Sequence, residues 1–89
     1  ELALSAKAWD EKSGRLMEVY TDLPGVQLYT ANSLNTDTGK GGAVYKDRPG
    51  YCFETQYFPD AANKPQFASP LLKAGEEYKT TTIYKFDVK

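Results

Sequence analysis

The sequence has no histidine and only one cysteine, Cys52, among its 89 residues. These absences exclude a Ser/His/Asp or Cys/His catalytic set, a zinc finger and an intrachain disulfide. Without soft ligands, no metal site is predicted. Cys52 alternates with aromatic residues, and no lysine or arginine lies within three residues of it. We therefore interpret it as a buried, inert thiol.

The sequence also lacks an excess of either charge and any long apolar run. Its 11 lysines and arginines are scattered and balance 12 acidic residues, so neither a nucleic acid nor a membrane is predicted as a partner. No apolar stretch approaches the roughly 20 residues that cross a bilayer. The unpaired cysteine and the lack of an N-glycosylation sequon favour the cytoplasm, although a periplasmic protein could share these features.

Five segments have the alternation or the β-branched and aromatic content of strands: residues 2–9, 15–21, 26–31, 51–57 and 78–88. A polar loop ending at Gly14 predicts a hairpin between the first two. Residues 32–49 indicate a long loop, and 60–63 a single helical turn. Without a crossover helix the fold class is all-β with antiparallel strands.

Five strands leave long sheet edges, which fits part of a larger β-sandwich better than a complete barrel. The chain also begins without a methionine while a strand pattern is already running at Leu2. We therefore expect it to have been cut from a longer protein. A complete domain of this mass would expose roughly 5,200 Å² of surface. Exposed edges would also permit association with copies of the chain.

Glu54 is the most informative single residue, because it lies between Phe53 and Thr55 in an aromatic strand. It must face solvent, pair with a cation, or occupy a pocket where it can act as a general base. Gln27 is a comparable polar insertion, and Gln56 lies on the same side of its strand as Glu54. Together they could form a pocket that reads hydroxyl groups. The glycine-rich run 39–42 lacks the spacing of a phosphate-binding loop.

The tryptophan and seven tyrosines suggest a second function, a non-catalytic β module that binds carbohydrate. Aromatic rings match the apolar face of a pyranose, but the same residues commonly form cross-strand pairs and a core. The composition alone leaves both interpretations open.

Three ordered blocks closely resemble the C-terminal part of the aldose 1-epimerases, or galactose mutarotases. They are residues 16–32 (LMEVYTDLPGVQLYTAN), 54–61 (ETQYFPDA) with Asn63, and 67–78 (FASPLLKAGEEY), and residues 82–86 (TIYKF) are similar to the family's closing strand. The resemblance implies that residues 1–89 are the C-terminal segment of a single aldose 1-epimerase domain, a β-supersandwich whose N-terminal part is absent here.

The resemblance also implies a reaction: interconversion of the α and β anomers of aldohexoses such as galactose or glucose, without metal or cofactor. Glu54 matches the family's general base, and Gln27 matches a residue lining the sugar site. A base for a weakly acidic hydroxyl benefits from a carboxylate held on a strand. An amide that both donates and accepts suits sugar hydroxyls.

The sequence departs from the family pattern in one important respect. The family's acid histidine, a second histidine, an arginine and an aspartate lie upstream of the matched region, and this chain has no histidine. The isolated chain is therefore expected to be inactive, with the N-terminal part of the same protein as its partner. A free sugar is favoured over a sugar phosphate, because neither arginine, Arg15 or Arg48, lies at a matched ligand position.

Overall fold

A hairpin of two seven-residue strands, β1 (Ala3–Trp9) and β2 (Arg15–Thr21), forms the N-terminal part of the chain. Asp10 closes its loop: the backbone N–H of Gly14 donates to the Asp10 carbonyl at 2.8 Å, and the Asp10 carboxylate accepts the N–H of Ser13 at 3.2 Å. Gly14 has φ +76°, which glycine adopts at little cost. The predicted hairpin is confirmed.

The strand β5 (Thr82–Val88) pairs antiparallel with β2 and completes a three-stranded sheet of order β1-β2-β5. The sequence pattern placed its start at Tyr78, which is wrong by four residues. The reason lies in Asp22, whose carboxylate accepts the Thr80 hydroxyl and, at 3.2 Å, the Thr81 N–H. Because the Thr80 hydroxyl and the Thr81 N–H donate to a side chain and not to a neighbouring strand, the regular β2–β5 ladder begins only at Thr82.

The strands β3 (Gly25–Tyr29) and β4 (Cys52–Gln56) form a separate antiparallel pair. Both lie close to their predicted ranges. The predicted helical turn is confirmed as the 3-10 turn η2 (Ala61–Asn63), and a second turn, η1 (Lys40–Gly42), lies within the predicted loop 32–49. The computed structural model describes residues 1–32, 39–46, 48 and 50–89, so part of that loop prediction lies outside the described residues.

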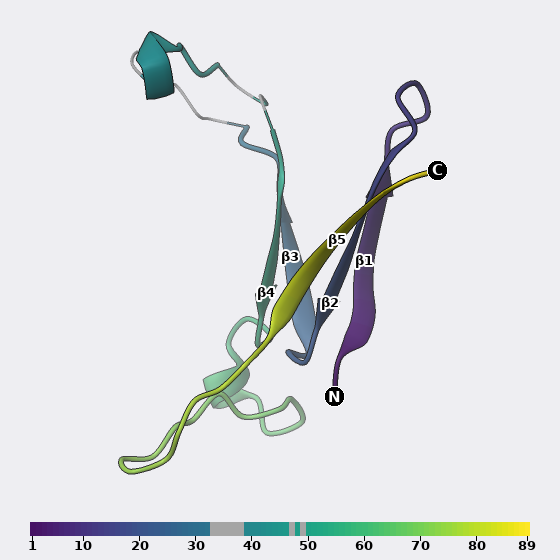
Figure 1. Ribbon diagram of the computed structural model, residues 1–89. Helices are drawn as coiled ribbons and strands as arrows, with labels where there is room; N and C mark the ends of the chain where they lie inside the picture. Colours follow the sequence, from purple (N-terminus) through teal and green to yellow (C-terminus); the bar gives the residue numbers. More distant parts are fainter. Residues whose placement is uncertain (33–38, 47, 49) are drawn as a thin grey trace.

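The β3–β4 pair stands beside the three-stranded sheet, and β5 begins next to the end of β4 (Figure 1). Val19 of β2 is fully buried, and Thr21 is 1% exposed. Among the described residues the only other buried apolar side chains are Ala31 and Ala61. The alternation of residues 2–9 is typical of a half-buried strand, but Leu2 and Leu4 at its start are exposed, and the β1–β2 register shifts between Leu4 and Ala6.

The surface of the chain is large for its mass. Its accessible area is 7164 Å², about 2,000 Å² more than a self-contained domain of this size exposes. Large apolar side chains account for part of it: Phe86 is 73% exposed and Val88 74%. The fold class is all-β with antiparallel strands, as predicted, and much of its apolar surface faces outward.

Candidate active site

Gln27 and Glu54, the two residues singled out in the sequence, are direct neighbours across the β3–β4 pair. The register places Gln27 opposite Glu54, with Val26 opposite Thr55 and Leu28 opposite Phe53. Side chains directly opposite in an antiparallel pair project from the same face, with Cβ atoms roughly 5 Å apart. A carboxylate and an amide that are 27 positions apart in the sequence are thus brought together.

This shared face points away from the three-stranded sheet. Thr55 faces inward, since its hydroxyl lies 2.9 Å from the Thr82 hydroxyl of β5. Leu28 and Phe53 line one hollow with Ala8 and Trp9 of β1, so they also face the other sheet. Because successive side chains of a strand alternate between faces, Gln27 and Glu54 project outward. Both are exposed.

The carboxylate of Glu54 is available to a ligand. The two ion pairs in the described part of the chain are Lys7–Glu18, at 3.9 Å, and Lys64–Asp60, at 3.4 Å, and neither involves Glu54. The Nε2 of Gln27 donates a long 3.4 Å hydrogen bond to the carbonyl of Leu28. Of the three possibilities that the sequence left open for Glu54, the structure of this chain shows the exposed one.

The same outward face carries Tyr29 opposite Cys52, and Gln56 opposite Gly25. Gln56 therefore flanks Glu54 on its own strand, as the alternation predicted. The interpretation of Cys52 as a buried thiol is wrong: the thiol is exposed. It lies two residues before Glu54 and shares its outward direction, so the aromatic residues beside it in sequence point to the opposite face.

Glu54 also borders an open hollow of about 490 Å³ along the edge of β4. Its other walls come from β2, β5, β4 and the residue before β4: Met17, Tyr51, Cys52, Phe53, Tyr84 and Phe86. Aromatic and aliphatic walls beside one carboxylate are the composition expected of a site for a small, partly apolar molecule. The contribution of β2 and β5 could not be predicted from the sequence, because strand patterns do not show how the two sheets face each other.

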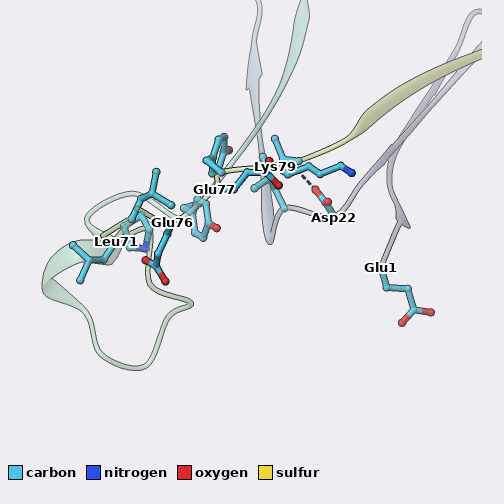
Figure 2. Close-up of a pocket in the computed structure, with 12 residues that line it drawn as sticks. Glu1, Asp22, Leu71, Glu76, Glu77 and Lys79 are labelled. Atoms are coloured by element: carbon cyan, nitrogen blue, oxygen red, sulfur yellow. Dashed lines mark hydrogen bonds between the residues drawn. The ribbon is translucent and has the colours of Figure 1, made fainter. Parts of the chain in front are cut away.

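A second hollow, of about 390 Å³, lies at the β2–β3 turn and has acidic walls from Glu1, Asp22, Glu76 and Glu77 (Figure 2). It contains neither Gln27 nor Glu54. The hydrogen bond from the Thr80 hydroxyl, followed by that from the Thr81 N–H, lowers the pKa of Asp22 below its ordinary value. Asp22 therefore acts in the structure as a fixed acceptor for the segment before β5.

Within residues 1–32, 39–46, 48 and 50–89, no group of three or more Cys, Asp or Glu side chains is placed to hold a metal ion. The same described ranges contain no helix long and apolar enough to span a bilayer. The candidate site therefore consists of the Glu54 carboxylate, the Gln27 and Gln56 amides on its face, and the aromatic-walled hollow that Glu54 borders.

Comparison with known proteins identifies a family model that covers most of the chain. The family model described as aldose 1-epimerase matches residues 1–85, which include β1 to β4, the first part of β5 and both candidate residues. The chain belongs to the aldose 1-epimerase family. This confirms the resemblance carried by the three sequence blocks.

Individual members of the family are similar over nearly the whole chain. This chain is 52% identical over 89 residues to the galactose mutarotase of Rattus norvegicus, and that alignment covers 99% of the chain. It is 54% identical over 84 residues to the galactose mutarotase of Homo sapiens, which covers 93% of the chain. It is 33% identical over 85 residues to the aldose 1-epimerase of Escherichia coli. These matches cover 26%, 25% and 25% of the relatives, so the chain spans about a quarter of their length.

Proposed function

We propose that this chain contributes the general base and one sugar-binding amide to an aldose 1-epimerase that interconverts the α and β anomers of aldohexoses such as galactose or glucose. The observation that carries the proposal is the pairing of Gln27 with Glu54 on one exposed face. The membership of the family supports the reaction class, and the pairing supports these two residues as its participants.

The chemistry requires a base at one atom of the sugar. The Glu54 carboxylate removes the proton from the anomeric hydroxyl, the bond between C1 and the ring oxygen breaks, and C1 becomes the aldehyde carbon. The ring oxygen takes a proton from an acid, and the C1–C2 bond rotates. On closure the hydroxyl oxygen attacks the other face of C1 and returns its proton to the acid, while the aldehyde oxygen takes the proton back from Glu54. Gln27 donates to one sugar hydroxyl and accepts from another, which fixes the sugar against the base.

The proton for the ring oxygen has to come from other polypeptide if it comes from a histidine, as the family resemblance implies, because this chain has none. We propose that the N-terminal part of the same protein supplies this acid and covers the apolar surface. The excess of about 2,000 Å² over a self-contained domain supports this partner, since each side of a standard stable interface buries only about 800 Å². On this account the isolated chain has no epimerase activity.

The test uses a chimera in which these 89 residues replace the matching segment of rat galactose mutarotase, called here the mutarotase chimera. Polarimetry should show faster interconversion of α-galactose or α-glucose than the spontaneous reaction. Glu54→Gln should abolish the enzymatic rate without changing the circular dichroism spectrum or the unfolding midpoint. A normal rate in a folded Glu54→Gln variant would contradict the role of Glu54.

A carbohydrate-binding module without catalysis is the alternative. It is favoured by a hollow of about 550 Å³ whose walls include Trp9, Tyr51 and Phe53, because such rings can stack on a pyranose. In the mutarotase chimera this alternative predicts saturable galactose binding in calorimetry together with no acceleration of anomer interconversion. Acceleration that depends on Glu54 would exclude it.

A further inference from the structure

Two side chains of β5 hold β4 at the residues directly before and after Glu54. The hydroxyl of Tyr84 donates to the backbone carbonyl of Phe53 at 3.0 Å. The Oγ1 atoms of Thr82 and Thr55 lie 2.9 Å apart. Since β4 and β5 belong to different sheets, these side-chain hydrogen bonds join them in place of a backbone ladder. We call the two contacts the β4–β5 tether.

The threonine half of the tether continues into the best-buried part of the chain. The Thr82 hydroxyl is also 3.2 Å from the Oγ1 of Thr21, and that oxygen accepts the backbone N–H of Leu23 at 3.1 Å. Thr21 is 1% exposed. Each hydroxyl–hydroxyl contact needs one donor, and either partner can supply it. One chain of hydrogen bonds thus links β2, β5 and β4.

The tether acts on the inner side of β4, whereas Glu54 projects from the outer side. Phe53 and Thr55 are the two sequence neighbours of Glu54, so fixing both of them fixes the position of its Cα and the direction of its side chain. Figure 1 shows β5, the edge strand of the three-stranded sheet, starting beside the end of β4. Thr82 at the start of β5 reaches Thr55, and Tyr84 reaches Phe53.

We infer that Thr82 and Tyr84 are positioning residues for the general base: they hold the β4 backbone on both sides of Glu54 so that the carboxylate stays aligned with the anomeric hydroxyl. This inference rests on the proposed function of Glu54. Neither side chain needs to touch the sugar. A displacement of a catalytic group by roughly 1 Å can lower a rate about 100-fold. Fixing the base on the short β3–β4 pair should therefore have a measurable effect on the rate.

The mutarotase chimera tests the inference with four variants. Tyr84→Phe removes only the hydroxyl that bonds Phe53, and Thr82→Val removes the hydroxyl between Thr21 and Thr55. We expect each to lower kcat by roughly 3- to 10-fold, with KM within about twofold of the parent. Thr82→Ser keeps the hydroxyl and should restore kcat. Tyr20→Phe is the matched control, because the Tyr20 hydroxyl bonds Glu18 within β2 and not β4.

Amide hydrogen exchange provides a readout that does not depend on catalysis. In Tyr84→Phe and Thr82→Val the amides of residues 52–56 should exchange faster, while those of 15–21 stay protected as in the parent. A loss of protection spread evenly over both segments would indicate general destabilisation and would overturn a positioning role.

The outcomes separate the two proposals. An inactive Glu54→Gln variant beside a fully active Tyr84→Phe, Thr82→Val double variant would overturn the positioning role and leave the proposed function standing. Full activity of Glu54→Gln would overturn the proposed function and, with it, the role of the tether in catalysis. Both proposals would be supported if Tyr84→Phe and Thr82→Val lower kcat without changing KM and Thr82→Ser restores kcat. The faster amide exchange in the first two variants should then be confined to residues 52–56.

Discussion

Asp22 is the residue that attaches the turn after β2 to the segment before β5. Its carboxylate accepts the Thr80 hydroxyl and the Thr81 N–H, and its own N–H donates to the Thr81 carbonyl at 3.4 Å. A strand start and a turn are therefore fixed by one side chain. The two hydrogen bonds to the carboxylate favour its ionised form and so lower its pKa.

This attachment should make stability depend on pH in the acid range. A lowered pKa contributes stability above the ordinary carboxyl value of 3.8, and the contribution is lost as the pH falls through the lower value of the folded state. In the mutarotase chimera, Asp22→Asn should lower the thermal midpoint at pH 6, and the difference from the parent should narrow below about pH 4.

Thr80→Val removes the hydroxyl that donates to Asp22. The difference in thermal midpoint between this variant and the parent should also narrow below about pH 4. A midpoint difference for Asp22→Asn that stays constant between pH 6 and pH 3 would show that the ionised carboxylate has no part in the effect.

At the residue level, the sequence predicted the polar pair but not its surroundings. Gln27 and Glu54 were recognisable because each is a polar insertion in an apolar strand and each matches a family motif. Their direct opposition depends on the β3–β4 register, which alternation within single strands does not fix. Cys52 was misassigned for a related reason, since its apolar neighbours in sequence lie on the other face of β4.

The β3–β4 pair depends on a close contact at its first residue. A Cβ at Gly25 would lie 2.8 Å from Cε1 and 2.9 Å from Cδ1 of Phe58. The Phe58 ring is in turn packed edge-on against Phe67, with ring centroids 5.0 Å apart. The glycine of the Pro-Gly-Val-Gln motif thus lets an aromatic pair cover the start of β3, two residues before Gln27.

Gly25→Ala should therefore destabilise the mutarotase chimera by about 1–3 kcal/mol, because the Phe58 ring has to move and is held by Phe67. Gly50→Ala is the matched control: no atom lies within 4 Å of a Cβ built there, and the change should stay within about 0.5 kcal/mol. Denaturant unfolding of both variants provides the measurement. Equal stabilities for the two would contradict the packing argument.

At the level of elements, the order and type of the strands could be predicted from the sequence, but not all of the residues at which they begin and end. The range 15–21 was predicted as observed, because a loop with Gly14 precedes it and a Leu-Pro-Gly turn follows. The start of β5 was placed too early because Tyr78 and Thr80 continue the alternation of the strand. Only the contact with Asp22, 59 positions from Thr81, ends the ladder there.

The whole molecule is more extended and exposes more surface than a self-contained domain of its size. Its radius of gyration is 16.7 Å, against about 12 Å for a compact domain of this length. Small domains are already marginal, because they bury a smaller fraction of their surface than large ones. We therefore expect the 89-residue chain to need further polypeptide for a cooperative fold.

Expressed alone, the chain should bind 8-anilinonaphthalene-1-sulfonate and unfold over a broad temperature range. Co-expressed with the remaining part of rat galactose mutarotase, it should co-purify as a complex with a sharp transition and without dye binding. A sharp, dye-free transition of the isolated chain would contradict the proposal that its apolar surface is normally covered.

The role of Glu54 as the base is the central claim, and polarimetry of the mutarotase chimera tests it most directly. Replacing Glu54 by glutamine keeps the shape of the side chain and removes its basicity. The rate of anomer interconversion should fall by roughly 10²- to 10⁴-fold, while Glu11→Gln in the exposed hairpin loop should retain the parent rate. A folded Glu54→Gln variant with a rate within about twofold of the parent would contradict the account.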